Sequence, residues 1–330
     1  MPGLRGDQQA LYVKDMYKAQ RESYMDMPTK FDKVFKVVTN VNGAGHKETQ
    51  ILGAGDLTRH TTEGQNIKFK SPIEGWSFYV KYHTYSDGIS LSKEAVEDTV
   101  KLGNLLKELA GSWGESVRVV KESLGARVFD NGGATAGDFV FNGSHTGNTD
   151  GSGDLLYDSK PLFNLTGNTR STKMGGTYYN SDSSLSVTVD DFETLYNLMT
   201  TTNNRNERDR IISLTPNTAL TRPGTDAFLM ERILDTSRGL PGGQLNDKNP
   251  FYKMVDPMTW DYLTDTAFYI GIRQHRDFQF HQRQQPAIRF FRDNGNLGYK
   301  ASIDLRCGIF IKNWRIWHRG SGTYGSAVVA

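Results

Sequence analysis

The sequence has little of what a disulfide-stabilised, secreted or membrane-embedded protein requires. It contains a single cysteine, Cys307, which excludes an intrachain disulfide bond. Its longest apolar runs, such as Ala267–Ile272, fall far below the roughly 18 residues of a membrane-spanning helix. Met1–Gln20 mixes charged with scattered apolar residues and lacks the apolar centre of a secretion signal. We therefore expect a protein made in the cytoplasm that does not enter a membrane.

Net charge is also small, at +2, although it is unevenly distributed. Residues 271–330 carry ten Lys and Arg against three Asp and Glu, a net charge of +7, which leaves −5 for residues 1–270. A basic segment of this kind suits an acidic neighbouring subunit or a phosphate backbone, but a solvated surface is the simpler interpretation. The charge count therefore identifies no partner.

Motifs with a recognisable chemistry are few and incomplete. The candidates are an acidic loop and a histidine pair around an aspartate: Asn148, Asp150, Asp154, His275, Asp277 and His281. The loop lacks the later bidentate glutamate of a calcium site, and the histidines lack a third ligand at metal spacing. Cys307 lies among strand residues, where a buried thiol is more common than a nucleophile. We therefore predict no catalytic residue, no cofactor and no metal site.

One pattern dominates what is present: an apolar face repeats over residues 92–129. Its members recur at steps of three, four or six residues: Val96, Val100, Leu106, Leu109, Trp113, Val117, Val120, Leu124 and Val128. This spacing predicts one long helix with Ser92 as its N-cap. Such a helix would span roughly 57 Å, whereas a compact chain of this size has a radius of gyration of about 20 Å. We therefore expect an elongated subunit.

Before this helix, the pattern predicts a short helix and a hairpin. Leu4–Tyr24 favours a helix that ends at Met25–Pro28, and an apolar cluster containing Phe31 and Phe35 follows it. Two alternating runs predict the strands of the hairpin, with residues 72–75 as the turn: Ile67, Phe69 and Ser71, then Trp76, Phe78, Val80 and Tyr82. Because a two-stranded hairpin is marginally stable alone, we expect it to rest on another surface, such as another subunit.

After the helix, residues 131–153 are rich in Gly, Asn, Ser, Thr and Asp and predict a loop. Thr188 predicts the cap of a helix to Met199, and Thr225–Ser237 predicts a second helix through Phe228, Ile233 and Leu234. Short apolar runs predict strands at residues 210–214, 268–272, 288–292, 299–305 and 308–317. The second half is therefore expected to be a mixed α/β domain that ends in sheet.

The order of these parts is more specific than any one motif. Thr84–Ala95 looks like the approach to a spine helix, Asp158–Phe163 contains a Pro-Leu-Phe segment, and Ile212–Pro216 and Met254–Pro257 are similar to parts of a central domain. Together with the arm, hairpin, long helix and closing strands, they resemble the major capsid proteins of tailed bacteriophages, which have the Hong Kong 97-type fold. The resemblance covers nearly the whole chain.

The resemblance implies an α+β fold with an N-arm, an E-loop hairpin, a long spine helix in the P-domain and a central α/β A-domain. It divides the chain as follows: N-terminal arm, 1–42; E-loop hairpin region, 43–84; P-domain with spine helix 92–129 and glycine-rich loop, 85–187; A-domain, 188–285; closing P-domain strands, 286–330.

The resemblance also implies a function, which is to form hexamers and pentamers of an icosahedral shell that encloses double-stranded DNA. Candidate contacts between subunits are Ile67, Phe69, Trp76, Phe78, Phe31, Phe35, Gly242 and Gly243. Expected partners are other copies of the chain, a scaffolding protein, a portal and a decoration protein, with DNA enclosed rather than read by sequence. The expected location is the virion capsid. Two alternatives stay open: an encapsulin-type nanocompartment shell, and a mixed α/β enzyme with a titrating cluster at His275, Asp277 and His281.

Overall fold

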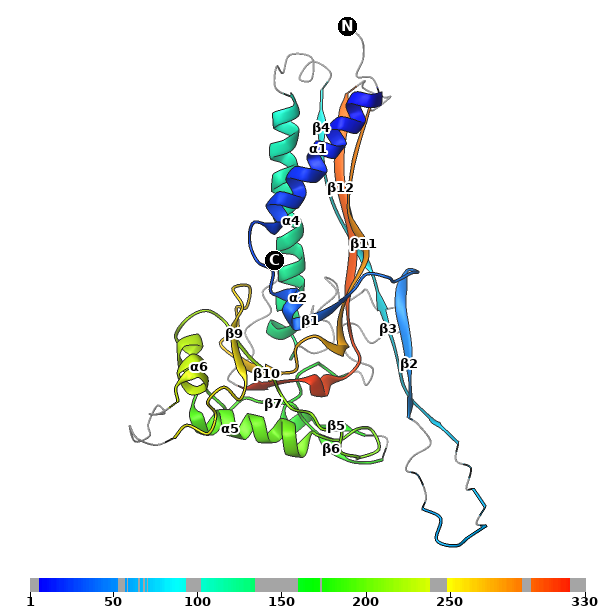
Figure 1. Cartoon of the computed structure of the whole chain (residues 1–330), viewed down its shortest axis with the longest axis vertical. Helices are drawn as coiled ribbons and strands as arrows, with labels where there is room; N and C mark the ends of the chain where they lie inside the picture. Colours follow the sequence, from blue (N-terminus) through cyan, green and yellow to red (C-terminus); the bar gives the residue numbers. More distant parts are fainter. Residues whose placement is uncertain are drawn as a thin grey trace.

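The computed structural model shows an elongated subunit, as the long helix predicted (Figure 1). The structure describes residues 6–52, 57, 59–64, 66–67, 69, 71–92, 102–133, 160–172, 174–237, 248–292 and 298–320. Among the helices in these ranges, none combines the length and the hydrophobicity needed to cross a membrane. The described chain builds a long part of two helices on a sheet, a second α/β part at one end, and a projecting hairpin.

The long part is organised by a four-stranded sheet in the order β1-β11-β12-β4. Its strands are β1 (Phe35–Val38), β4 (His83–Leu91), β11 (His275–Arg292) and β12 (Tyr299–Ile311). β1 pairs in parallel with β11, and the other pairs are antiparallel. Alternate residues of β12 from Tyr299 to Cys307 are buried, because successive side chains of a strand point to opposite faces. One face of the sheet is therefore available to carry the helices.

The predicted spine helix is present as α4 (Leu102–Asp130), and residues 93–101 lie outside the described ranges. Its buried residues include the predicted apolar positions Leu106, Trp113, Val117, Leu124 and Val128. Trp113 Nε1 donates a hydrogen bond of 2.9 Å to Asp87 Oδ2 on β4. That strand was not predicted: residues 84–91, interpreted as the approach to the helix, form a half-exposed edge strand of mixed polarity.

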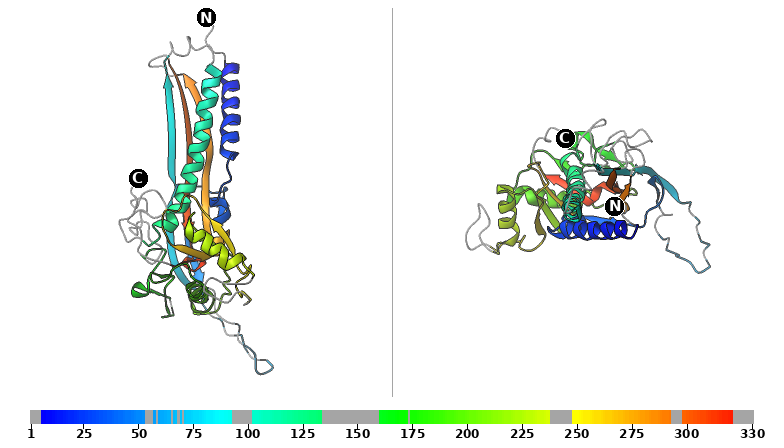
Figure 2. Two further views of the ribbon diagram at one scale, coloured as in Figure 1. Left: turned by 90° about the vertical axis from the view of Figure 1, so that its left-hand side faces the viewer. Right: turned by 90° about the horizontal axis from the view of Figure 1, so that it is seen from above.

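The predicted N-terminal helix is confirmed as α1 (Gly6–Met25), which lies beside α4 against the long sheet (Figure 2). A Cβ atom on Gly114 of α4 would stand only 2.5 Å from the backbone oxygen of Gln20 in α1. The glycine therefore permits the two helices to approach closely. The short helix α2 (Phe31–Val34) follows and leads into β1.

Gly114→Val is expected to displace α1 from α4, because the added side chain would overlap the Gln20 backbone oxygen of α1. We expect a loss of about 1–3 kcal/mol in stability, typical of overpacking, and faster hydrogen exchange in α1. Gly111→Val is the matched control, since no described atom beyond the adjacent backbone of α4 itself lies within 4 Å of the Cβ position there. Equal exchange in α1 for both variants would contradict this packing.

The second part is a five-stranded sheet in the order β7-β13-β10-β8-β9 with two helices. Its elements are β7 (Ser181–Asp182), α5 (Val189–Asn197), β8 (Thr218–Thr221), α6 (Thr225–Asp235), β9 (Asp256–Thr259), β10 (Phe268–Gly271) and β13 (Trp317–Gly320). A two-stranded sheet of β5 (Arg170–Ser171) and β6 (Thr177–Tyr178), a π-helical turn (Leu198–Thr202) and 3₁₀ turns (Thr166–Asn168, Trp314–Ile316) complete it. The predicted cap of α5 is confirmed, because Thr188 Oγ1 accepts a 3.2 Å hydrogen bond from the Asp191 amide.

Two predicted strands of this half are wrong. Residues 210–214 make only an isolated bridge between Ile211 and Arg205, and Ser213 adopts a left-handed φ of 54° that interrupts extended backbone. Residues 308–317 do not form one strand, because a 3₁₀ turn separates the end of β12 from the start of β13. The apolar side chains of both runs resemble those of a strand, but neither run is paired along its whole length with a neighbouring strand.

The proposed domain limits stay predictions. The limit at residue 285 falls inside β11, and β13, assigned to the closing strands, pairs with β10 and β7 in the five-stranded sheet.

The two parts are joined by aromatic packing around Phe129, near the end of α4. Its ring centroid lies within 6.3 Å of six others, those of Phe35, Phe163, Trp260, Tyr269, Phe278 and Trp317. This shared core fixes the spine helix to both sheets.

Candidate functional site

The projecting hairpin is the feature with the clearest capacity to contact another molecule (Figure 1). Its strands are β2 (Gly45–Leu52) and β3 (Ile73–Lys81), paired antiparallel from Gly45 opposite Lys81 to Leu52 opposite Ile73. The predicted pairing was therefore wrong. The predicted turn at residues 72–75 lies largely within β3, and the true partner strand is mostly polar, so it gave no alternating apolar signal. We call residues 53–72 the tip segment.

The described apolar side chains at and beside the tip segment are exposed. Ile67 is 67% exposed and Phe69 is 93% exposed, and Leu57 and Ile51 are similarly open at 100% and 69%. Trp76 and Phe78 lie on β3, with Phe78 opposite Glu48 in the ladder. Apolar side chains held away from the subunit's core gain free energy when a partner covers them. The tip segment therefore has the chemistry of a contact surface.

Side chains from the long sheet hold the base of the hairpin. Arg283 Nε donates to the Gly43 carbonyl at 2.8 Å, and Arg306 donates to the Ala44 carbonyl at 3.3 Å. Lys312 forms an ion pair with Glu48 on β2. Arg283 lies on β11, Arg306 lies on β12, and Lys312 directly follows β12. These contacts therefore fix the direction in which the hairpin leaves the subunit.

A histidine pair completes this base. The ring of His46 lies 5.0 Å from that of His281 and 4.7 Å from that of Phe310, between centroids. Nδ1 of His281 shares a 2.8 Å hydrogen bond with the Tyr82 hydroxyl. Burial, with a smaller contribution from His46, lowers the pKa of His281 from 6.5 to about 4. His281 is therefore neutral at physiological pH and packs as an aromatic side chain.

Stability is expected to fall between pH 6.5 and pH 4, because unfolded histidine binds a proton there while folded His281 does not. At pH 4, the loss of unfolding free energy that arises from His281 is about 3 kcal/mol. His318, whose pKa is lowered to about 3, also lowers stability as the pH falls. His281→Gln should reduce the pH dependence by the first amount. Denaturant titrations of both proteins across this range measure it, and equal pH dependence would contradict the assignment.

The other candidate contact residues have different positions. Phe31 and Phe35 are 3% and 0% exposed and pack on Phe280 and Phe278 of β11, so their role in this structure is within the subunit. Gly242 and Gly243 lie outside the described residues. Phe228, one of the apolar positions that predicted α6, is 68% exposed, while Ala227, Met230, Ile233 and Leu234 are buried. Phe228 is an additional apolar surface residue of the second part.

The residues considered for chemistry do not form a described reactive centre. In the ranges that the structure covers, no group of three or more His, Cys, Asp or Glu side chains is arranged to hold a metal ion. Nδ1 of His275 lies 3.8 Å from Asp277, while His281 engages Tyr82 and Gln279. Burial raises the pKa of Cys307 to about 12, so its reactive thiolate is not formed at neutral pH. The possible calcium loop at residues 148–154 lies outside the described ranges.

Comparison with known proteins gives likenesses of structure rather than of sequence. No family model matches the chain, and no curated protein matches its sequence. The mature capsid of bacteriophage PhiM1 matches with a TM-score of 0.54 at 8% identity, over 91% of this chain and 89% of that one. A structure from Mycobacterium phage Patience matches with a TM-score of 0.51 at 12% identity, over 98% and 91%.

A structure of the holo-SrpI encapsulin complex from Synechococcus elongatus is also similar, with a TM-score of 0.48 at 9% identity over 90% of this chain and 88% of that one. The two higher matches cover 91% and 98% of this chain, so they extend over both parts of the structure. The chain therefore has the Hong Kong 97-type fold of bacteriophage major capsid proteins.

Proposed function

We propose that this protein is a major capsid protein whose copies assemble into hexamers and pentamers of an icosahedral shell around double-stranded DNA. The observation that carries the proposal is the exposure of the described apolar side chains of the tip segment, Leu57, Ile67 and Phe69, on a projecting hairpin in a chain with a capsid fold. Its role is structural rather than catalytic. Its location is the virion capsid, after synthesis in the host cytoplasm.

The energetics of the hairpin favour assembly of many copies over a stable pair. Covering each of Ile51, Leu57, Ile67 and Phe69 would contribute about 1.5–3 kcal/mol. Association costs about 4–15 kcal/mol in lost translational and rotational freedom, so one hairpin contact gives little net affinity. In a closed ring or shell, each further contact forms within an existing assembly and the affinities accumulate. Weak individual contacts also allow wrongly placed subunits to dissociate.

The proposed partners follow from the proposed role as a major capsid protein. Other copies of the chain cover the tip segment, and Trp76 and Phe78 stay candidate contacts between copies. A scaffolding protein, a portal and a decoration protein are proposed to bind the assembled shell rather than the single subunit. The net charge of +2 suits enclosure of DNA better than tight binding, because strong phosphate neutralisation needs a dense basic surface.

Particles purified after expression with the neighbouring genes would test what the shell encloses. We expect nuclease-resistant double-stranded DNA in particles that also contain a portal. Particles that hold a protein cargo and no DNA would instead favour an encapsulin-type compartment, and would contradict the DNA-enclosing function while leaving the shell fold intact.

A further inference from the structure

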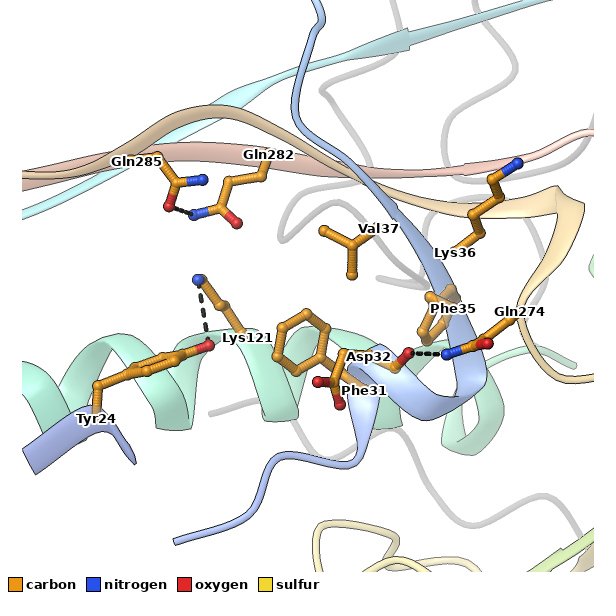
Figure 3. A pocket seen from close by; sticks show the side chains of 10 residues that line it. All are labelled: Tyr24, Phe31, Asp32, Phe35, Lys36, Val37, Lys121, Gln274, Gln282 and Gln285. Carbon is orange, nitrogen blue, oxygen red and sulfur yellow. Dashed lines mark hydrogen bonds between the residues drawn. The ribbon is translucent and has the colours of Figure 1, made fainter. Parts of the chain in front are cut away.

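A groove between the N-terminal helix and the body of the subunit contains an unusual buried charge. One cavity of about 630 Å³ lies between α1, α2, β1, α4 and β11 (Figure 3). A second of about 370 Å³ adjoins it beneath α1. Tyr24, Lys121 and Gln285 line both cavities, so these three residues occupy the junction of the groove.

Lys121 of α4 supplies the charge at this junction. The residue is only 4% exposed, and its Nζ donates a 3.3 Å hydrogen bond to the Tyr24 hydroxyl. The ammonium also lies over the rings of Tyr24 and Phe31, at 4.8 and 5.8 Å from their centroids. Among the described residues, no carboxylate forms an ion pair with it. Burial lowers the pKa of Lys121 to about 8, so the group is still charged at neutral pH.

Two neutral donors stand beside this ammonium. The Tyr24 oxygen accepts from Lys121, which leaves its own proton available to a further acceptor. The side-chain oxygen Oε1 of Gln285 accepts a 2.7 Å hydrogen bond from Gln282 Nε2, which orients the Gln285 side-chain amide and leaves its NH₂ group to donate. Figure 3 shows Nζ of Lys121 between the Tyr24 hydroxyl and the two glutamine amides. Donors from α1, α4 and β11 thus gather at one point.

The surrounding groups define the kind of acceptor that fits. Lys36 and Arg21 line the two cavities and add positive charge, whereas Asp32 lies in the first cavity and disfavours a doubly charged anion. Apolar side chains, including Phe31 and Val37, form part of the wall and suit a short aliphatic stem. A singly charged group on a small apolar body meets both conditions.

We propose that the groove binds a carboxylate group, with Lys121 as its counter-ion and Tyr24 and Gln285 as hydrogen-bond donors. The carboxylate is either a free small acid or an Asp or Glu side chain from a neighbouring copy of the chain. In both cases the bound group joins α1 to α4 and β11, and so fixes the N-terminal helix on the subunit. The inference depends on the groove and not on the proposed shell.

Saturation-transfer NMR with acetate as the probe, on the unassembled protein at constant ionic strength, tests the site. We expect a saturable signal in the wild type that Lys121→Met weakens about tenfold or more, since a charged hydrogen bond is lost. Lys14→Met is the matched control, because Lys14 is an exposed lysine of α1, and it should leave the signal unchanged. No saturable signal in the wild type, or an equal signal in Lys121→Met, would overturn the proposal.

A second variant keeps the test independent of folding in α4. Gln285→Ala alters an exposed side chain of β11 and should weaken acetate binding about fivefold, while unchanged binding would contradict the donor assignment. The same probe applied to assembled particles separates the two sources of the carboxylate. Loss of the acetate signal in particles assigns the site to a neighbour's side chain, and a retained signal assigns it to a free acid.

Discussion

Phe69→Asp is expected to abolish shell formation while leaving the subunit folded. Phe69 is 93% exposed on the tip segment, so the substitution removes almost no contact within the chain. In an assembly, however, it would place a carboxylate in an apolar contact and forfeit about 1.5–3 kcal/mol at every copy. Because the loss repeats around each ring, we expect no particles in sedimentation and an unchanged circular dichroism spectrum.

Two variants of the same segment serve as controls. Phe69→Leu keeps an apolar side chain and should retain particles, and Thr62→Asp adds the same charge to an exposed polar position without removing an apolar one. Intact shells from Phe69→Asp would remove the tip segment from the assembly contact. If none of the three variants formed particles, the segment would tolerate no substitution, and the result would not show a need for an apolar side chain at residue 69.

Arg319→Met is expected to lower the free energy of unfolding by about 3–5 kcal/mol, because it leaves a buried carboxylate without its counter-ion. Arg319 donates a 2.6 Å hydrogen bond to Asp265, and the two side chains are 0% and 4% exposed. Asp265 also lies 3.4 Å from the Tyr269 hydroxyl, so the pair connects β13 to the aromatic core around Phe129. Denaturant unfolding of the unassembled subunit measures the loss.

The chain offers a matched surface pair as a control. Arg273 and Asp256 form a 2.9 Å ion pair with side chains that are 42% and 64% exposed, so Arg273→Met should cost no more than about 1 kcal/mol. The double variant Arg319→Met/Asp265→Leu should recover part of the stability, because no unpaired charge is then buried. A loss from Arg319→Met as small as that from Arg273→Met would show that the buried pair does not support this part of the fold.

The elements that the sequence predicted well are those with a sustained period or a capping residue. The spine helix, α1, α5 with its Thr188 cap, and α6 all follow from apolar positions or caps within the element itself. β2 and the first half of β11 were not predicted, because His, Lys, Gln and Arg dominate their sequences. These strands are held extended by hydrogen bonds to β3 and β12, their partner strands. A strand fixed by a remote partner leaves little signal in its own residues.

The candidate site was predictable only in part, for a related reason. Apolar residues that belong to no long periodic segment were expected to contact another subunit. Ile67, Phe69, Phe31 and Phe35 were therefore all predicted to be contact residues. The structure separates them: the first pair is exposed, and the second is buried, with its rings packed on aromatic side chains of β11. Sequence alone does not tell whether such a residue is covered by its own chain or by another. Lys121 gave no signal either, because an isolated lysine in a helix usually faces solvent.

Electron microscopy of the purified protein, expressed alone and with its neighbouring genes, tests whether copies of this chain assemble into a shell. We expect closed shells, or rings of five and six subunits, in which the hairpin of one copy lies on the next. A uniformly small, monodisperse species in both preparations would contradict this expectation.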